Sequence, residues 1–167
     1  MIADSRTSVA FTGHRTYRGA AADALRRTVG ELYARGFRNF LSGMAVGFDL
    51  AAAEAVLELR ERAPGVRLVA AVPFRGQEMR FSPADRERFR RVLAEADSVE
   101  VLAPAYHRGC YAVRNDFLVY NARVLVAWYD GSPGGTRHTV SRALRRGLEF
   151  VNLHPQRAGV ALTEPTL

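Results

Sequence analysis

The sequence contains no lysine, so all 24 of its basic residues are arginine. It contains a single cysteine, Cys110, which excludes an internal disulfide and is typical of proteins in the reducing cytoplasm. It has no run of about eighteen apolar residues, which argues against a membrane-spanning helix. Residues 1–6 lack the basic and then apolar layout of a secretory signal. We therefore expect a cytoplasmic protein that does not associate with membranes.

The net charge of +7 has two explanations. Arginine forms bidentate contacts with phosphate and carboxylate groups, which favours an anionic partner, either a nucleotide or a nucleic-acid backbone. Alternatively, the arginines reflect a GC-rich genome, and the complete absence of lysine favours this second explanation. Many arginines also stand among acidic residues, as at 60–62 and 85–88, which is typical of a solvated helix face. The charge alone does not establish nucleic-acid binding.

Short apolar segments alternate with longer segments of helical period. The expected strands are residues 9–12, 39–42, 67–73, 98–102, 124–128 and 149–153. Most are apolar throughout, which is typical of strands buried on both faces of a sheet. Five helical patterns lie between them, and in the fourth we expect Val113, Phe117 and Tyr120 to share the buried face. Gly36 and Gly147 stand where two of the helices should end.

This order of elements predicts a single Rossmann-like α/β domain with three layers, α/β/α, and a mostly parallel sheet of about six strands. No repeat, linker or change of composition divides the chain. We expect the domain to span residues 8–155, with flexible termini at 1–7 and 156–167. Two irregular connections, 74–83 and 103–109, follow strands at the carboxyl edge of the sheet, where open α/β sheets bind ligands.

Three of the turns that follow expected strands carry glycine. They are residues 12–15 (Thr-Gly-His-Arg), 42–49 (Ser-Gly-Met-Ala-Val-Gly-Phe-Asp) and 130–136 (Asp-Gly-Ser-Pro-Gly-Gly-Thr). Glycine lets a ligand approach the backbone closely, and the N-terminus of the following helix attracts phosphate. One such turn is more often a plain tight turn, but three at the same edge of one sheet favour a ligand site.

The second of these turns has a further polar group. Gly43 and Gly47 flank the start of a helix, and Asp49 lies in its first turn. Asp49 either stabilises that helix end or hydrogen-bonds a ribose hydroxyl. The turn is not a Walker loop, because no Lys-Ser/Thr follows it, and it does not match the G-x-G-x-x-G dinucleotide pattern. The sequence therefore indicates neither ATP hydrolysis nor hydride transfer.

Several motifs resemble those of known families. Residues 42–52, Ser-Gly-Met-Ala-Val-Gly-Phe-Asp-Leu-Ala-Ala, resemble the S-G-x-A-x-G-x-D-x-x-A signature of the DprA/Smf proteins. Residues 134–136, Gly-Gly-Thr, are similar to the P-G-G-x-G-T turn of the LOG phosphoribohydrolases. Both families belong to the SLOG superfamily of Rossmann-like nucleotide-binding proteins. Within it, residues 11–15, 109–110, 114–115 and 129–136 most resemble the YpsA-like branch of bacterial proteins.

The resemblance implies a pocket at the carboxyl edge of the sheet for a nucleotide or nucleotide-derived ligand, such as a nucleoside phosphate or an ADP-ribose-like molecule. Arg114 matches the arginine that works at the glycosidic centre of LOG enzymes, and Asn115 stands where they carry lysine. An arginine here could hold a phosphate bidentately, and the alternative is a surface ion pair. Thr139 stands where LOG enzymes carry glutamate, and it cannot supply the carboxylate that cleavage of an N-glycosidic bond needs. Other carboxylates could substitute for it: Asp49, Asp116, Asp130 or Glu78.

The expected ligand contacts come from the three turns and from the segment around Arg114. They are Gly13, His14, Arg15, Ser42, Gly43, Met44, Ala45, Gly47, Asp49, Arg114, Asn115, Asp130, Gly134, Gly135 and Thr136. His14 is a candidate base contact, general acid or plain turn residue, and Cys110 is expected to be a small buried apolar side chain. One of four loop aromatics could stack on a base: Phe74, Phe81, Tyr106 or Tyr111. The histidines show no metal-ligand spacing, so we predict no metal, and we assign no catalytic residue.

The preferred function is binding of a small nucleotide ligand by a sensor or regulator. The first alternative is an enzyme, a nucleotide N-glycosidase or phosphoribohydrolase with a rearranged acid. The second is DprA-like binding of single-stranded nucleic acid, which is less favoured because no additional domain extends a nucleic-acid path. We predict no cofactor other than the nucleotide itself, and a homodimer is a candidate assembly.

Overall fold

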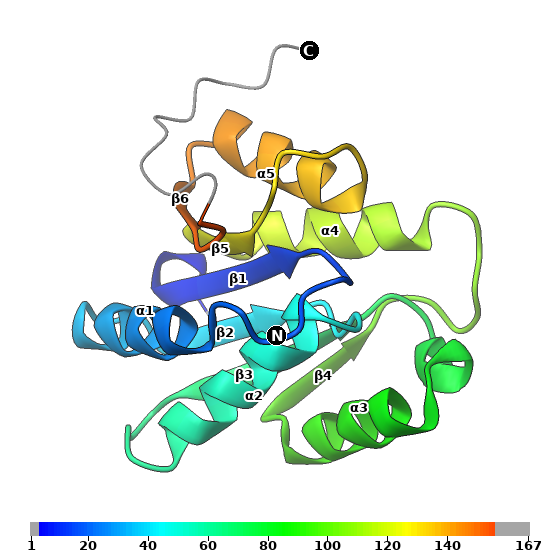
Figure 1. Cartoon of the computed structure of the whole chain (residues 1–167), viewed down its shortest axis with the longest axis horizontal. Helices are drawn as coiled ribbons and strands as arrows, with labels where there is room; N and C mark the ends of the chain where they lie inside the picture. Colours follow the sequence, from blue (N-terminus) through cyan, green and yellow to red (C-terminus); the bar gives the residue numbers. More distant parts are fainter. Residues whose placement is uncertain (1–3, 156–167) are drawn as a thin grey trace.

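The computed structural model describes residues 4–155, and strands alternate with helices throughout them (Figure 1). The strands are β1 (Ser8–Gly13), β2 (Asn39–Ser42), β3 (Arg67–Val72), β4 (Ser98–Val101), β5 (Val124–Trp128) and β6 (Glu149–Asn152). The α-helices are α1 (Ala22–Ala34), α2 (Phe48–Arg60), α3 (Pro83–Glu95), α4 (Cys110–Tyr120) and α5 (Gly135–Arg145). Two short 3-10 helices are η1 (Ser5–Thr7) and η2 (Gln77–Arg80).

The six strands of this part of the chain form one parallel sheet in the order β4-β3-β2-β1-β5-β6. All the predicted strands are confirmed, and their ends differ by at most one residue from the prediction. Strands β1, β2 and β5 are buried along almost their whole length, which explains their continuous apolar sequence. The edge strand β4 instead alternates between half-buried and exposed residues. The predicted Rossmann-like α/β fold class is therefore confirmed.

Helices cover both faces of the sheet. Helices α1, α2 and α3 lie on one face, and α4 and α5 lie on the other (Figure 1). On the first face, the ring of Phe11 packs against those of Phe40 and Phe48, with centroids 6.3 and 6.4 Å apart. On the second face, Leu118 of α4 belongs to the same buried cluster as Leu125 of β5. Among residues 4–155, no helix combines the length and the apolar character that crossing a bilayer requires.

The ends of the helices follow local sequence signals. At the start of α3, the hydroxyl of Ser82 accepts a hydrogen bond from the backbone N–H of Asp85, and Pro83 is the first helical residue. Gly36 and Gly147 adopt positive φ angles of 105° and 78° just after α1 and α5. This is the conformation that helix ends use to turn the chain, so both glycines stand where the sequence places them.

The strand order reverses between β1 and β5. From β1 the sheet grows outward through β2, β3 and β4, and the chain then returns to add β5 and β6 on the other side of β1. In open α/β sheets, a crevice forms at the carboxyl ends of the two strands that flank such a reversal. His14 follows β1, and its backbone N–H donates to the carbonyl of Trp128 at the end of β5, at 3.3 Å. The first glycine turn therefore lies at the reversal point.

The buried face of α4 differs from the predicted one. Val113 and Tyr120 are 49% and 55% exposed, whereas Cys110, Arg114 and Leu118 are buried. The prediction was wrong because it grouped the apolar residues of the helix, and the true inward face includes an arginine. Four-residue spacing places Cys110, Arg114 and Leu118 on one face, and that face covers the sheet next to the reversal point.

The N-terminal segment also differs from the prediction. Residues 5–7, expected to be part of a flexible terminus, form η1, in which the Asp4 carboxylate accepts a hydrogen bond from the backbone N–H of Arg6. The carbonyl of Thr7 then accepts from the backbone N–H of Arg38, at 2.9 Å. The other predicted flexible residues, 1–3 and 156–167, lie outside the described part of the chain.

Gly13→Ala is expected to destabilise the protein, because a Cβ at residue 13 would lie 2.5 Å from the Cβ of Phe48. Overpacking of this kind costs about 1–3 kcal/mol, which urea denaturation measures as a lower free energy of unfolding. Gly30→Ala is the matched control, because Gly30 lies inside α1 and an added Cβ meets nothing within 4 Å. The control should gain about 1 kcal/mol from better helix propensity. If both substitutions raised, or both lowered, the free energy of unfolding, the close contact between Gly13 and Phe48 would be contradicted.

Candidate functional site

A cavity of about 360 Å³ opens at the reversal point of the sheet, within the size range of small-molecule sites. We call it the switch-point cavity. It is lined by the first glycine turn, the middle and the end of the second, one face of α4 and the first residues of α5. The lining residues are Thr12, Gly13, His14, Arg15, Ala45, Asp49, Tyr111, Arg114, Asn115, Leu118, Gly135 and Thr136.

The guanidinium of Arg114 is the most deeply buried cation of the site, with only 6% of the residue exposed. Its Nη1 donates to the carbonyl of Gly43, and its Nε donates to Oδ1 of Asn115 at 2.8 Å. A Cβ on Gly43 would lie 2.8 Å from Cδ of Arg114, so glycine is needed there to make room for the arginine. Within residues 4–155, Nη2 of Arg114 has no hydrogen-bond partner, which leaves it available to a ligand.

Asp49 is a buried carboxylate in the first turn of α2. Its Oδ2 accepts a hydrogen bond from the backbone N–H of Ala45 at 3.3 Å, and its Oδ1 has no partner within the described residues. Burial raises the pKa of Asp49 to about 6, although the nearby positive charge of Arg114 opposes this shift. Burial likewise lowers the pKa of Arg114, and Asp49 opposes that shift. The two groups thus stabilise each other's charged forms.

His14 is held by the third glycine turn. Its Nε2 lies 2.8 Å from Oδ1 of Asp130 and 3.1 Å from the backbone nitrogen of Asp130. The hydroxyl and the backbone N–H of Ser132 donate to the same carboxylate at 2.6 and 2.8 Å. These hydrogen bonds, followed by the charge of His14, lower the pKa of Asp130 to about 2. Asp130 is therefore ionised and positions the imidazole without lining the cavity itself.

An aromatic ring lies between two cations at the mouth of the cavity. The guanidinium carbons of Arg15 and Arg114 lie 5.7 and 5.6 Å from the ring centroid of Tyr111, within the range of cation–π attraction. Of the four aromatics predicted to stack on a base, Tyr111 lines the cavity and the other three do not. Tyr111 lies in the first turn of α4 and not in the predicted loop. Phe74 packs on the rings of Tyr106 and Tyr111 instead, and Phe81 packs on Phe89.

The N-terminus of α5 closes the cavity on the side of the third turn. Gly134 precedes the helix with φ of 138°, and Gly135 and Thr136 line the cavity. The first N–H groups of a helix lack partners within that helix, and together with the helix dipole they attract anions. Thr139, one turn further on, is fully buried, and its hydroxyl donates to the carbonyl of Gly135 at 3.1 Å. The position where LOG enzymes carry glutamate is thus occupied by a hydroxyl bonded to its own helix.

The structure brings most of the predicted ligand residues together in the lining of the cavity, and the others do not line it. Those that line it are Gly13, His14, Arg15, Ala45, Asp49, Arg114, Asn115, Gly135 and Thr136. Those that do not are Ser42, Gly43, Met44, Gly47, Asp130 and Gly134. The second group shapes the turns. For example, the Ser42 hydroxyl donates to the backbone carbonyl of Asp49, and Met44 is fully buried with φ of 64°.

Two lining residues, Thr12 and Leu118, were not among the predicted contacts, and Tyr111 was predicted only as one of four candidate stacking aromatics. Tyr111 and Leu118 stand three residues before and four residues after Arg114 on α4. That helical spacing was the signal available in the sequence.

The remaining candidate groups lie elsewhere. Asp116 of α4 approaches Nη1 of Arg142 of α5 at 3.3 Å, Glu78 lies in η2, and neither carboxylate lines the cavity. Cys110 is buried at the start of α4 and does not line the cavity. Among residues 4–155, histidine, cysteine and carboxylate side chains nowhere gather in a group of three that could hold a metal ion.

The family model of YpsA, described as the "YspA SLOG family", matches residues 10–149. The chain belongs to this family. The resemblance carried by the glycine turns and by Arg114-Asn115 is therefore confirmed at the level of the family.

Relatives from Bacillus species support the assignment. The chain is 28% identical over 134 residues to a UPF0398 protein of Bacillus thuringiensis (strain Al Hakam). The matched segment covers 78% of this chain and 72% of the relative. It is 27% identical over 139 residues to a UPF0398 protein of Bacillus cereus (strain G9842), with coverage of 81% and 75%.

Solved structures of DNA processing protein A share the fold. The Streptococcus pneumoniae protein superposes with a TM-score of 0.62 at 19% identity, over 87% of this chain and 49% of that chain. The Helicobacter pylori protein, whose structure concerns single-stranded DNA binding, gives 0.60 at 16% identity, over 87% and 64%. A structural-genomics target, TM1055, gives 0.58 at 16% identity, over 96% and 85%. This chain thus spans about half the length of the pneumococcal protein.

Asp49→Asn is expected to change how stability depends on pH. An aspartate that ionises near pH 3.8 when unfolded and near 6 when folded keeps its proton longer in the folded state. As the pH rises from 3.8 to about 6, the free energy of unfolding of the native protein should therefore fall relative to that of the variant. Above about pH 6 the difference between the two free energies should stay constant. The interval corresponds to about 3 kcal/mol. Urea denaturation of both proteins across this range measures it, and parallel curves would show that Asp49 has an ordinary pKa.

Proposed function

We propose that this protein binds a nucleoside phosphate or a nucleotide-derived molecule, such as an ADP-ribose-like ligand, in the switch-point cavity and acts as a sensor or regulator. The proposal rests on one observation: buried Arg114, whose Nη2 has no hydrogen-bond partner among residues 4–155, and the N-terminus of α5 line the same cavity. Two separate elements thereby offer N–H donors and positive charge to the same anion.

The same cavity holds groups suited to the rest of a nucleotide. Arg15, at the mouth, adds a second positive charge close to Tyr111. The unpartnered Oδ1 of Asp49 accepts hydrogen bonds only, so it complements a hydroxyl or amino group on the ligand. A buried polar atom without a partner costs free energy, and a ligand donor would remove that cost. A sugar hydroxyl next to a phosphate supplies this combination.

Binding is favoured over hydrolysis because the described lining of the cavity offers no carboxylate that is free to take part in catalysis. Asp49 is the only carboxylate of the described cavity lining, and Arg114 and the Ala45 N–H already engage its charge. Cleavage of an N-glycosidic bond requires a carboxylate that faces the sugar carbon or activates water, and Thr139 is bonded to its own helix. The proposal is therefore a binding site, with a nucleotide N-glycosidase as the alternative that the experiment distinguishes.

Isothermal titration with AMP and with ADP-ribose tests the proposal. Arg114→Lys keeps the charge but loses the planar fork, and Arg15→Gln removes an exposed charge without disturbing the core. Each substitution should raise the Kd by about tenfold, because it removes one charge-assisted contact worth about 1.4 kcal/mol. Arg137→Gln is the matched control, since Arg137 is exposed one residue beyond Thr136 and does not line the cavity. Its Kd should equal that of the native protein.

Chromatography of the same mixtures detects free adenine. The proposal predicts intact ligand after prolonged incubation. Release of adenine that Asp49→Asn abolishes would instead establish the N-glycosidase. Salt-sensitive binding to oligonucleotides without any response to AMP or ADP-ribose would favour the DprA-like alternative.

A further inference from the structure

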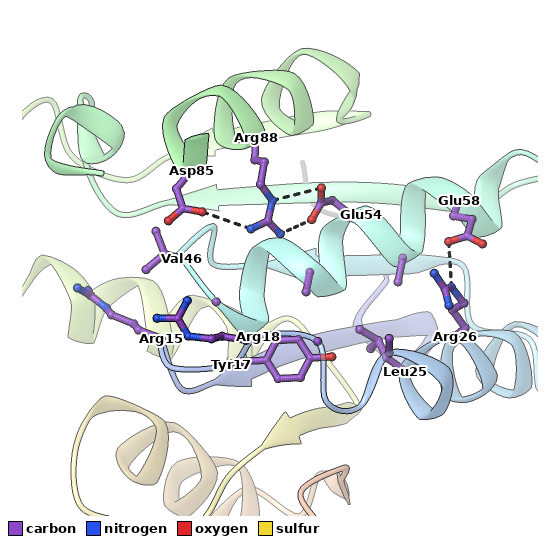
Figure 2. A pocket seen from close by; sticks show the side chains of 15 residues that line it. Arg15, Tyr17, Arg18, Leu25, Arg26, Val46, Glu54, Glu58, Asp85 and Arg88 are labelled. Carbon is purple, nitrogen blue, oxygen red and sulfur yellow. Dashed lines mark hydrogen bonds and ion pairs between the residues drawn. The ribbon is translucent and has the colours of Figure 1, made fainter. Parts of the chain in front are cut away.

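A second hollow, of about 520 Å³, shares Arg15 with the switch-point cavity. We call it the groove. It lies between the β1–α1 turn, the first turns of α1, the outer face of α2 and the start of α3 (Figure 2). Arg15, Val46 and Gly47 of its lining belong to the first two glycine turns, and most of the other lining residues come from helix surfaces.

The arginines of the groove are of two kinds. Arg88 contacts Glu54 and lies 3.3 Å from Asp85, and Arg26 lies 3.2 Å from Glu58. Figure 2 shows these contacts as dashed lines, whereas Arg15 and Arg18 carry none. Within residues 4–155, neither Arg15 nor Arg18 forms an ion pair. The groove therefore has two unneutralised guanidinium groups at the end nearest the switch-point cavity.

Gly47 lets the β1–α1 turn that carries these two arginines approach the start of α2 closely. It precedes α2 with φ of 83°, and a Cβ there would lie 2.7 Å from the carbonyl oxygens of His14 and Arg15. The β1–α1 turn thus rests directly on the start of α2. This close approach places Arg15 between the two hollows, with Arg18 further along the same turn.

Apolar side chains lie between the charged groups of the groove. Ala22, Leu25, Ala51 and Ala55 line it from α1 and α2, and the small alanine side chains leave its volume open. An apolar wall next to two free guanidinium groups complements a base or sugar attached to a phosphate. The groove adds a volume of about 520 Å³ to the 360 Å³ of the switch-point cavity, which gives room for a second unit next to Arg15.

We infer that the groove is a second subsite for one ligand that occupies both hollows: two nucleoside-sized or sugar-sized units joined through phosphate. The first unit lies in the switch-point cavity, as the proposed function requires, and the second lies in the groove. Arg15 and Arg18 contact the joining phosphate groups. A 3′,5′-linked dinucleotide and a pyrophosphate-linked nucleotide share this chemistry.

The test compares Kd values of AMP, the dinucleotide pApA and ADP-ribose by isothermal titration. At least one of the two longer ligands should bind about tenfold more tightly than AMP, the gain expected from one added charge-assisted contact. Arg18→Gln should remove this advantage and leave the Kd of AMP unchanged. Which longer ligand shows the gain distinguishes the two linkages. Arg27→Gln is the matched control, because Arg27 is exposed on α1 and does not line the groove.

The failures of the two proposals are distinguishable. If AMP binds but neither longer ligand binds more tightly, or if Arg18→Gln weakens all three equally, the groove is not a subsite and the proposed function stands. If none of the three binds, the proposed function fails, and the two-part ligand fails with it. A further tenfold gain with a ten-nucleotide strand would assign the groove to a nucleic-acid path and would contradict a ligand of two units.

Discussion

The buried guanidinium of Arg114 is the interaction on which the site depends. It reaches from α4 to the carbonyl of Gly43 in the second glycine turn. That turn leads into α2, which covers one face of the sheet, and α4 covers the other (Figure 1). Two conditions make this contact feasible. Gly43 has no Cβ to block it, and the carboxylate of Asp49 offsets the charge. A buried cation without such partners would be strongly destabilising, so the site depends on the turn, the helix and the carboxylate together.

This arrangement separates two roles within the glycine turns. Gly43, Met44 and Gly47 shape the second turn. A Cβ on Gly43 or Gly47 would clash with neighbouring atoms, and Met44 and Gly47 have positive φ angles. Gly135 and Thr136 instead present the start of α5 to the cavity. The turns therefore bring a helix N-terminus, a buried arginine and an unpartnered carboxylate oxygen to one place, and the sheet reversal between β1 and β5 makes the space for them.

The sequence predicts the fold closely and the site in part. The strands follow from continuous apolar segments, because central parallel strands are buried on both faces. The inward face of α4 does not follow from its apolar residues, since Arg114 is buried there while Val113 is exposed. The groove was also missed, because Arg18 belongs to no motif and most of the other lining residues come from three separate helices that only the fold brings together. Motifs identify the turns, whereas side-chain neighbours across helices require the three-dimensional arrangement.

Nuclear magnetic resonance during titration with AMP tests directly whether a nucleotide binds in the switch-point cavity, because the chemical shift of each backbone amide reports on its own surroundings. We predict that the largest shifts occur at Gly135 and Thr136 at the start of α5 and at His14 and Arg15 in the first turn. We also expect these shifts to saturate together with a single Kd. Shifts concentrated away from the reversal point, for example along β4, with unchanged amides at the start of α5, would contradict binding in this cavity.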